Sequence, residues 1–583
     1  MSHITDTENR PKVALVTLHA GYSHSSLALR SIAAYAERWS CPHQMQLFEF
    51  LVNSNHQELL ERVLDYQPRI LGFSTYLWNI TACLRLARVI KQLLPEITLI
   101  LGGPEAGARG EELLSTVPEL DLIVEGEGEA AFSDLLRLLL NSEGAYEQVS
   151  GLVYRTNGGI YRNPVQLLPV EQIPATLAQG LFDSEKPLVY WETSRGCPYQ
   201  CTFCSSATDR LRAFPMERVK TELKVLEQLS NKTVKLLDRS FHLGKARTTE
   251  LLKRFAATPQ GLRFHLELNP DRISEQALAI FREAEPGKFQ FEIGLQTLDE
   301  DVLLRIDRNM DVVKALENIR QLTEMRRHPV HLDLIVGLPG ESRAQCASSL
   351  DHTFKLAPDH LQLGTLKLLP GTPLHRYAVK LGYRWDHEAP YEVLSSPSLD
   401  FKEIARFKLY AELLERLYNS DLMRNTLTGL VTFSFGGRLS SCFDSLLDET
   451  VRSLARKNMQ PDSLFEHMCD FIGPYIEACP TLEEWLLWDY CQYSLVTGKT
   501  PTWIAERLVK SELLTVQGTR RRLPVITLTP QGASLISKLS SVDYAAGQYA
   551  LWPKQHKRGK PVEVFRINSG CIMTDGFTLA RLE

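Results

Sequence analysis

The chain has 583 residues, which is enough for about three domains of ordinary size. A net charge of −5 excludes a basic footprint for nucleic acid over the whole chain, although it does not exclude a local one. No apolar run approaches the roughly 20 residues of a membrane span, so we expect no membrane association.

Residues 12–145 alternate between strand and helix patterns. Strands are predicted at 13–18, 44–50, 70–74, 98–101 and 120–124, and helices at 25–37, 56–65, 80–93 and in a segment ending at 140. This alternation predicts a parallel, doubly wound, Rossmann-like sheet, in which ligands bind at the carboxyl ends of the strands.

Glycines fall at those predicted strand ends, where a ligand must approach the backbone closely or where a turn needs glycine. Gly102 and Gly103 follow one strand, and Gly126 and Gly128 follow another. No GxGxxG follows the first strand, so the dinucleotide fingerprint is absent.

Residues 146–186 are predicted to form a connector. Two short runs at 152–155 and 159–162 flank Thr156-Asn157-Gly158, which is typical of a β-hairpin. Three prolines then punctuate an extended segment.

Three cysteines follow at CxxxCxxC spacing, directly after a strand-like run at 187–191: Cys197, Cys201 and Cys204. Three thiolates in one loop hold three irons of a 4Fe–4S cluster and leave the fourth open to a substrate. A structural zinc site would need a fourth ligand, and the nearest candidate, His242, lies well downstream. Buried structural cysteines are the other alternative, but Gly196 and Pro198 indicate a loop.

Residues 187–375 contain six βα-like units. Strand-like runs occur at 187–192, 233–238, 263–268, 288–296, 329–337 and 360–369. Six such units predict a partial (β/α)6 barrel, whose chemistry would lie at the C-terminal ends of the strands.

Residues 395–583 are predicted to form a mostly helical domain of unknown role. Helical periodicity appears at 401–418, 443–456, 463–476 and 482–493, and strand-like runs at 525–528 and 562–565. Two basic clusters, Arg520–Arg522 and residues 554–560, are either a nucleic-acid contact or a solvated face.

The cysteine spacing, with Phe203 before the last cysteine, resembles the radical S-adenosylmethionine superfamily. A Rossmann-like domain ahead of this loop is similar to that of the cobalamin-binding members. Three local matches carry the second resemblance: Gly72-Phe73-Ser74-Thr75, residues 101–105 (LGGPE) and residues 124–129 (VEGEGE). The resemblance covers roughly residues 12–375. The DxHxxG motif is absent, so a histidine ligand below cobalt is not expected from His19 or His24.

The resemblance implies three cofactors: a 4Fe–4S cluster on the three cysteines, S-adenosylmethionine and cobalamin. Its implied contacts to S-adenosylmethionine are Phe203, Asp238, Glu267, Gln296, Leu338 and Pro339. Its implied contacts to cobalamin are Ser74, Thr75, Gly102, Gly103, Pro104, Gly126, Glu127 and Gly128. No catalytic residue is assigned.

The implied activity is methylation of an unactivated carbon, or phosphorus, through a 5′-deoxyadenosyl radical. Radical rearrangement or cyclisation without net methylation, RNA modification, and a non-enzymatic cluster- or cobalamin-binding role are the alternatives. We expect a small molecule or peptide as substrate rather than nucleic acid, and an external electron donor such as flavodoxin or ferredoxin. The chain has no secretory signal at its polar start and its cysteines are mostly scattered, so we expect the reducing cytoplasm.

Overall fold

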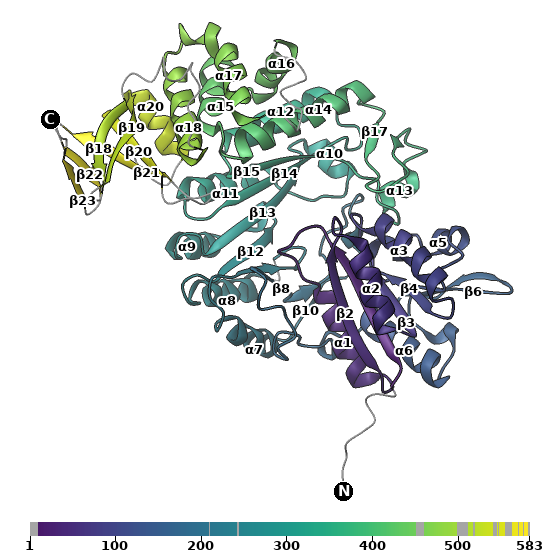
Figure 1. Cartoon of the computed structure of the whole chain (residues 1–583). Coiled ribbons are helices and arrows are strands. Elements are labelled where there is room, and N and C mark those ends of the chain that lie inside the picture. The colour runs from purple at the N-terminus through teal and green to yellow at the C-terminus, as the bar shows by residue number, and fades with distance from the viewer. Residues whose placement is uncertain are drawn as a thin grey trace. The chain divides into compact units, whose positions relative to one another are not determined.

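The computed structural model describes residues 10–208, 210–241, 244–449, 460–497, 511–516, 519–539, 545, 547–553, 562–568, 571–574 and 577–580 (Figure 1). The chain folds as two compact units. The first comprises Met1–Phe291, Leu303–Met310 and Leu366–Pro397, and the second comprises Glu292–Val302, Asp311–Thr365 and Ser398–Glu583.

A seven-stranded sheet forms the start of the first unit, in the order β2-β1-β3-β4-β5-β6-β7. Its strands are β1 (Lys12–His19), β2 (Gln44–Leu51), β3 (Ile70–Ser74), β4 (Thr98–Gly102), β5 (Leu122–Val124), β6 (Leu152–Thr156) and β7 (Gly159–Arg162). The first five strands are parallel, with Val13 opposite Ile70 and Ser74 opposite Gly102. Because the carboxyl ends of parallel strands share one edge, the predicted glycine turns lie along the same edge.

Helices cover both faces of this sheet. They are α1 (Leu27–Trp39), α2 (His56–Tyr66), α3 (Ile80–Leu93), α4 (Pro104–Ala108), α5 (Gly110–Thr116) and α6 (Gly128–Asn141). On one face α2 to α5 pack against Ala14 and Val16, and on the other α1 and α6 pack against Val13 and Leu15. Neighbouring residues of β1 therefore pack into hydrophobic cores on opposite faces of the sheet, which confirms the predicted doubly wound fold. The short helices α4 and α5 were not predicted.

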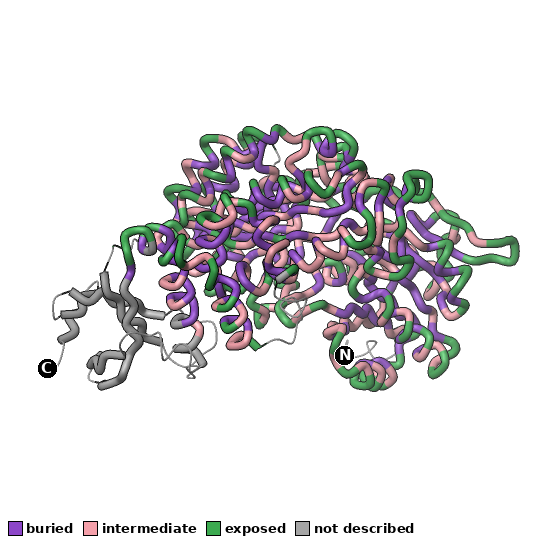
Figure 2. The backbone as a smooth tube through the Cα atoms, turned by 90° about the horizontal axis from the view of Figure 1, so that it is seen from above, coloured by how far each residue is buried: buried purple, intermediate pink, exposed green. Residues whose placement is uncertain are grey.

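The predicted hairpin, β6 and β7, extends this sheet. β6 pairs antiparallel with β5, placing Tyr154 opposite Leu122. The base of β6 is buried, whereas its tip protrudes and is exposed (Figure 2). Part of the predicted connector therefore completes the N-terminal sheet.

The second sheet has six strands in the order β15-β14-β13-β12-β11-β8. Its strands are β8 (Leu188–Trp191), β11 (Thr233–Leu236), β12 (Arg263–Leu268), β13 (Phe289–Gln296), β14 (Val330–Val336) and β15 (His360–Thr365). The helices between them are α7 (Met216–Leu226), α8 (Lys245–Ala256), α9 (Glu275–Glu283), α10 (Glu300–Arg305), α11 (Val312–Met325) and α12 (Arg343–Lys355). Strand order follows chain order and the described pairs are parallel, so the six predicted βα units are confirmed.

Local chemistry explains where several of these helices begin. Ser26 caps α1 by accepting from the amide of Leu29, and Asp311 caps α11 by accepting from that of Lys314. Ser342 and Gln345 form a reciprocal capping box at the start of α12.

Helices dominate the chain after α13 (Pro373–Tyr377): α14 (Phe401–Leu413), α15 (Arg424–Ser434), α16 (Leu439–Glu449), α17 (Pro461–Ile476), α18 (Thr481–Thr497) and α20 (Pro530–Leu539). The predicted helical character is confirmed over the described residues, and α15 is an addition. Residues 450–456 of the helix predicted at 443–456 lie outside the described residues. Strand content exceeds the prediction, because six antiparallel strands follow: β18 (Ser511–Val516), β19 (Thr519–Leu528), β20 (Gly547–Pro553), β21 (Val562–Asn568), β22 (Cys571–Thr574) and β23 (Phe577–Ala580). The side chains of Arg520–Arg522 and all of residues 554–560 lie outside the described residues. Among the described helices, none is both long and apolar enough to cross a membrane.

Candidate functional site

The cysteine loop, which we define as residues 196–211, is closed at its base by a short ladder. β9 (Ser194–Arg195) pairs antiparallel with β10 (Arg212–Ala213). Gly196 enters the loop at a φ of +83°, a conformation that glycine adopts without strain.

The middle of the loop is held by backbone hydrogen bonds at Thr202. Its amide donates to the carbonyl of Ile306 over 3.0 Å, and its carbonyl accepts from the amide of Leu374 over 2.9 Å. Within the loop the amide of Cys204 donates to the carbonyl of Cys201 over 3.1 Å. The segment that carries the cysteines is therefore fixed on both sides.

The three thiols of the loop are free of disulfides. Cys201 is buried, with 5% of its surface exposed, while Cys197 and Cys204 are partly exposed. Burial raises the pKa of the Cys197 and Cys201 thiols, and for Cys201 the Arg308 guanidinium opposes this rise. Arg308 donates from Nη1 to Cys201 Sγ over 3.8 Å.

The donor set was tested for its fit to an iron–sulfur cluster. Three free thiols in one loop are the ligands that such clusters use. Over the part of the chain that the structure describes, no group of three or more His, Cys, Asp and Glu side chains is arranged to hold a metal ion, these cysteines included. The chemistry of the donors fits a cluster, and their present geometry adds no support.

Asp238 follows β11 and is fully buried. Its Oδ2 accepts from the Thr193 amide over 2.8 Å, and its Oδ1 accepts from the hydroxyls of Thr193 and Ser194 over 2.7 and 2.6 Å. Burial raises the pKa of Asp238 to about 6, and these hydrogen bonds limit the rise. Both carboxylate oxygens are thus used to hold the approach to the cysteine loop.

The next strand end is linked to the cysteines through Arg308. Its Nη2 donates to Asn269 Oδ1 over 3.2 Å, and the Asn269 amide donates to Ser240 Oγ over 2.6 Å. Glu267 is a partly exposed residue of β12, and its carbonyl accepts from the amide of Phe241. Phe203 is partly exposed in the cysteine loop.

The remaining predicted contacts to S-adenosylmethionine lie in the second unit. Gln296 ends β13 with a φ of +70°, Leu338 is fully buried and Pro339 is partly exposed. Beside them, buried Glu341 accepts from the hydroxyl of Thr297 over 2.6 Å. Burial raises the pKa of Glu341 to about 7, and the hydrogen bonds from Thr297 and Cys346 oppose the rise.

In the N-terminal domain, Thr75 ties two strand ends together. Its amide and hydroxyl both donate to the carbonyl of Gly102 over 2.8 Å, and its Oγ1 accepts from the amide of Ala106. Ser74 is buried, and its carbonyl accepts from Asn79. Pro104 begins α4 after Gly103.

The glycines of these turns differ in the space around them. A Cβ on Gly103 would lie 2.4 Å from the carbonyl oxygen of Thr75, and a Cβ on Gly126 would lie 2.7 Å from Val165. A Cβ on Gly128 would lie 2.7 Å from the tip of Ile32. A Cβ on Gly102 would meet nothing closer than 3.7 Å, so packing does not explain glycine there.

Glu127 binds the base of the cysteine loop. It accepts from Arg195 Nη1 over 3.3 Å and also from Arg212. Glu129, two residues after Glu127, accepts from Arg195 Nη2 over 2.7 Å. The VEGEGE segment and the base of the cysteine loop, which are about 70 residues apart in sequence, are therefore in direct contact within the first unit.

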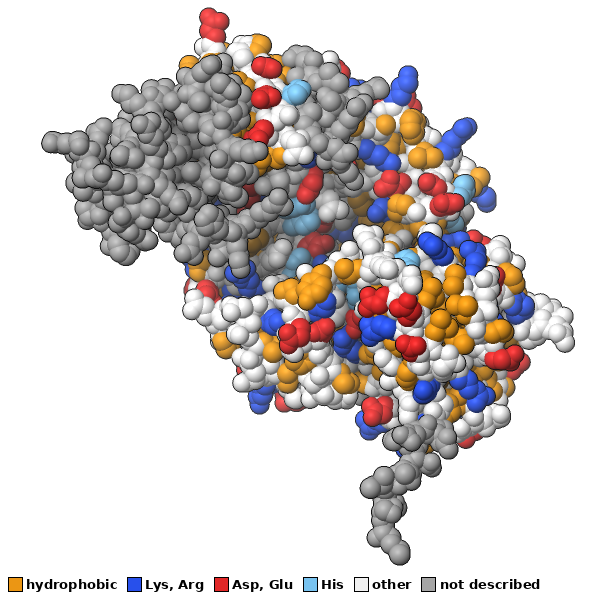
Figure 3. All heavy atoms as spheres, viewed as in Figure 1, with side chains coloured by type: hydrophobic (Ala, Val, Ile, Leu, Met, Phe, Trp, Pro, Cys, Tyr) orange, Lys and Arg blue, Asp and Glu red, His pale blue; other side chains and the backbone are white. Residues whose placement is uncertain are grey.

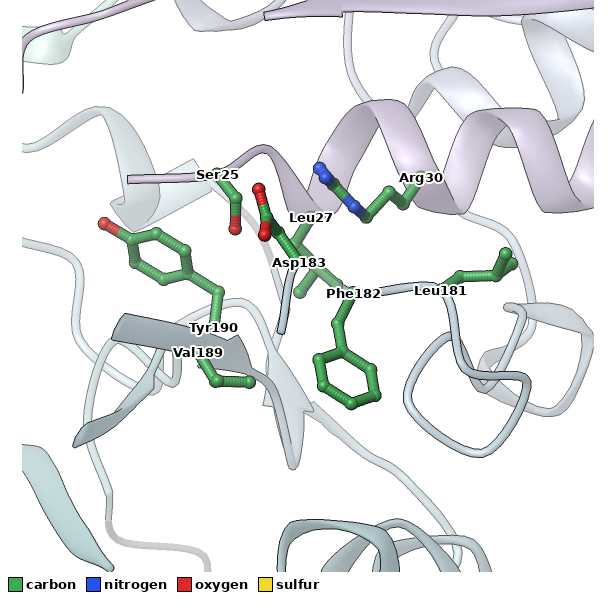
Figure 4. A pocket seen from close by; sticks show the side chains of 8 residues that line it. All are labelled: Ser25, Leu27, Arg30, Leu181, Phe182, Asp183, Val189 and Tyr190. Atoms are coloured by element: carbon green, nitrogen blue, oxygen red, sulfur yellow. The ribbon is translucent and has the colours of Figure 1, made fainter. Parts of the chain in front are cut away.

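Both histidines of the first turn have hydrogen-bond partners. His19 Nε2 lies 2.7 Å from Glu49, and His24 Nδ1 is hydrogen bonded to the hydroxyl of Tyr190. Tyr190 also lines a small pocket with Ser25, Arg30 and Asp183 (Figure 4).

Several polar groups at the site were not predicted from the sequence. Arg308 lies 107 residues from Cys201, and no local pattern relates the two. Arg195 and Glu129 lie within the two sequence motifs, but the predictions for those motifs concerned their cysteines and glycines. The alternation of residues along the strands does indicate three further polar side chains that are not part of the hydrophobic core. The strands β11, β13 and β14 bury every second residue and leave Lys235, Glu292 and Asp333 partly exposed.

On the face shown in Figure 3, the described acidic and basic side chains are interspersed over the N-terminal domain, without a stripe of one sign. This agrees with the modest net charge.

Comparison with known families gives three matches along the chain. Residues 13–136 match the family described as a B12 binding domain, and residues 191–352 match the radical SAM superfamily. Residues 379–525 match a family described as a protein of unknown function, DUF4080. The first two domains imply a 4Fe–4S cluster, S-adenosylmethionine and cobalamin as cofactors.

Among curated proteins, the chain is similar to the cobalamin-dependent radical SAM methyltransferase TokK of Streptomyces tokunonensis. The two are 27% identical over 370 residues, which cover 60% of this chain and 53% of TokK. A more distant relative is the anaerobic magnesium-protoporphyrin IX monomethyl ester cyclase of Synechocystis sp., 24% identical over 290 residues that cover 46% of this chain and 56% of the cyclase. These matches span only about half the length of each of the two relatives.

Among solved structures, the cobalamin-dependent S-adenosylmethionine radical enzyme OxsB with aqua-cobalamin and S-adenosylmethionine bound has a similar fold. The TM-score is 0.58 at 16% identity, and the match covers 80% of this chain and 75% of OxsB. At this identity the likeness concerns the fold alone, and it agrees with the two-sheet architecture described above.

Proposed function

The chain belongs to the proteins that join a B12-binding domain to a radical SAM domain, and from this premise we propose that it is a cobalamin-dependent radical S-adenosylmethionine methyltransferase. One observation carries the proposal. Three free thiols, in a loop held by backbone hydrogen bonds on both sides, lie in the same compact unit as the strand-end turns of the B12-binding domain. Salt bridges from Arg195, at the base of this loop, reach Glu127 and Glu129 in one of those turns.

We assign the cluster to Cys197, Cys201 and Cys204. When bound, the cluster, S-adenosylmethionine and cobalamin supply the electron, the 5′-deoxyadenosyl radical and the methyl group, respectively. The protein supplies position. Asp238 holds residues 193 and 194 through three hydrogen bonds, and Thr202 fixes the loop between Cys201 and Cys204.

Arg308 differs from Asp238 and Thr202 because it places a positive charge beside a cysteine sulfur. Its guanidinium is buried and lies next to Cys201. Hydrogen bonds to ligand sulfurs and burial are among the properties that set cluster potentials. We assign Arg308 to the stabilisation of negative charge on the Cys201 sulfur.

The contacts to cobalamin and S-adenosylmethionine are also proposals. For cobalamin we retain Ser74, Thr75, Gly102, Gly103, Pro104, Gly126 and Gly128, and we assign Glu127 to the contact with Arg195. For S-adenosylmethionine we retain Phe203, Glu267, Gln296, Leu338 and Pro339. Asp238 is reassigned as an anchor of the loop, because both its oxygens already accept hydrogen bonds.

The proposed domain limits are 12–145 for cobalamin, 146–186 for the connector, 187–375 for the barrel and 395–583 for the C-terminal domain. We propose a small molecule or peptide as the substrate, modified at an unactivated carbon or at phosphorus. A flavodoxin or ferredoxin of the reducing cytoplasm is the proposed electron donor.

Radical cyclisation or rearrangement without net methylation is the second candidate. It is favoured by the similarity to the Synechocystis cyclase, in which the matched residues make up 46% of this chain and 56% of the cyclase. Both candidates share cleavage of S-adenosylmethionine and differ in the second product.

The experiment that tests the proposal is product analysis on anaerobically purified protein supplied with cobalamin. The protein is incubated with dithionite and methyl-deuterated S-adenosylmethionine, in the presence of small-molecule extracts. Methyl transfer predicts 5′-deoxyadenosine together with S-adenosylhomocysteine and a deuterium-labelled product. Turnover that yields 5′-deoxyadenosine without S-adenosylhomocysteine would favour the second candidate and exclude methyl transfer.

Cys201→Ala is the control for this experiment. It should abolish the cluster and the formation of 5′-deoxyadenosine while the N-terminal domain still binds cobalamin. Undiminished 5′-deoxyadenosine formation by this variant would contradict the assignment of the cysteine loop.

A further inference from the structure

Arg195 lies at the junction between the two proposed cofactor sites. It precedes Cys197 by two residues, and its side chain is only 16% exposed. Three carboxylates surround its guanidinium. Nη2 lies 2.7 Å from Glu129, Nη1 lies 3.3 Å from Glu127, and Nε lies 3.1 Å from Glu192.

Two of these carboxylates belong to the B12-binding domain and one to the barrel. Glu127 and Glu129 follow β5 at the start of α6, whereas Glu192 follows β8. A guanidinium has five donors in a rigid fork, so one arginine can hold groups from both domains together. A single lysine could not reproduce this arrangement.

Glu129 makes this contact difficult to break. Its surface is 3% exposed, and its other hydrogen bond comes from the hydroxyl of Ser31 on α1 over 2.7 Å. Burial by itself would raise the pKa of Glu129, but Arg195 outweighs this and the pKa is lowered. Removing the arginine would leave a buried carboxylate without its counter-charge, which is strongly unfavourable.

Arg212 provides a natural comparison. It lies opposite Arg195 in the two-stranded ladder and also binds Glu127. However, it follows the cysteines instead of leading into them, and no contact joins it to Glu129 among the described hydrogen bonds.

We propose that Arg195 is a positioning residue that couples the cobalamin-binding turn, residues 125–129, to the cysteine loop, so that occupation of one cofactor site changes the affinity of the other. The inference rests on the proposed function, because it takes the cluster and cobalamin as the two ligands. Coupling of two binding equilibria is reciprocal, so it can be measured from either site.

The test measures the dissociation constant of hydroxocobalamin for the full chain by equilibrium dialysis under anaerobic conditions. It compares cluster-loaded protein with the Cys197→Ala/Cys201→Ala/Cys204→Ala variant, which cannot bind a cluster. We expect the two constants to differ by about fivefold or more. In Arg195→Gln and in Glu129→Gln, the corresponding ratio should approach one.

Two variants serve as matched controls. Arg212→Gln removes a neighbouring cation without touching Glu129, and Glu192→Gln removes a contact that stays within the barrel. Both should retain most of the ratio. Arg195→Lys should retain only part of it, because an ammonium group has three donors instead of five and lacks the rigid planar fork of the guanidinium.

The outcomes separate this inference from the proposed function. Wild-type protein that retains neither iron nor cobalamin would contradict the proposed function, and the inference with it. If wild-type protein binds both the cluster and cobalamin but has the same dissociation constant for hydroxocobalamin as the triple cysteine variant, the inference is overturned and the proposed function is left standing. A ratio that survives in folded Arg195→Gln and Glu129→Gln, judged by circular dichroism, would also overturn it. If Arg195→Gln does not fold, Glu129→Gln and Arg195→Lys decide the question.

Discussion

The turns of the N-terminal domain and the cysteine loop hold their shapes by different means. At Gly103 and Gly126 the turns are defined by backbone conformation and close packing, and there is no room for a side chain. The approach to the cysteine loop is held by hydrogen bonds that Asp238 accepts from Thr193 and Ser194, and the loop itself is held by backbone hydrogen bonds at Thr202. A packed turn fails when an atom is added, whereas a bonded loop fails when an acceptor is removed.

The largest effect is expected from Gly103→Ala, which adds one methyl group to a packed turn. Gly103 has φ +94° and ψ 169°, a region that is almost exclusive to glycine, and its Cβ would lie 2.4 Å from a backbone oxygen. We expect a loss of about 3 kcal/mol or more in the free energy of unfolding. Urea unfolding measures it, and a stability equal to that of the wild type would show that the turn is not fixed by packing.

A comparable loss is expected when the acceptor of the cysteine loop is removed. Asp238→Ala would leave three buried donors on Thr193 and Ser194 without a partner, at a cost of about 3 kcal/mol. Asp238→Asn is the matched variant, since its amide oxygen can accept from the Thr193 amide while its NH₂ donates to hydroxyls that rotate. Its loss should stay near about 1 kcal/mol. Similar unfolding energies for the two variants would contradict the anchoring role.

The charge of the same carboxylate predicts a pH dependence. Burial raises the pKa of Asp238 from 3.8 to about 6, so between these values the folded state retains a proton that the unfolded chain has released. The free energy of unfolding should therefore fall as the pH rises from about 4 to 6, by roughly 3 kcal/mol. Subtracting the profile of Asp238→Asn isolates this contribution from other titrating groups. A difference that rises with pH would reverse the assigned direction.

The smallest effect on stability, and the most informative for function, is expected from Gly102→Ala. Its Cβ would meet only Val124, at 3.7 Å, which is an ordinary contact. Stability should change by less than about 1 kcal/mol. If the glycine is there to admit a ligand, the affinity for hydroxocobalamin should fall by about tenfold, equivalent to about 1.4 kcal/mol. Unchanged affinity would leave this glycine without a role in binding.

The sequence predicted the elements well where periodicity was strong. The bounds of the helix at 80–93 and the strand at 70–74 agree with α3 and β3. The short helices α4 and α5 were missed because Gly107 and Gly110 interrupt any helical periodicity in 104–116. The six C-terminal strands were underestimated because only two of them show a strand-like run.

For the site, the sequence located the cysteines and the turns but not the groups that bind them together. Arg308 approaches Cys201 only through the tertiary fold, and Asp238 was predicted to contact S-adenosylmethionine. A carboxylate at a strand end has the same appearance in a sequence whether it binds an ammonium group or the neighbouring loop. Only the geometry shows that both oxygens of Asp238 accept from Thr193 and Ser194.

We propose that the cysteine loop holds a cluster with an open iron, beside a cobalamin-binding domain. The most direct test is to reconstitute the full chain anaerobically, measure bound iron and cobalamin, and record the EPR spectrum of the reduced cluster with and without S-adenosylmethionine. We expect about four irons per chain, bound cobalamin, and a spectrum that changes when S-adenosylmethionine is added. A chain that retains no iron, or a cluster whose spectrum is indifferent to S-adenosylmethionine, would contradict it.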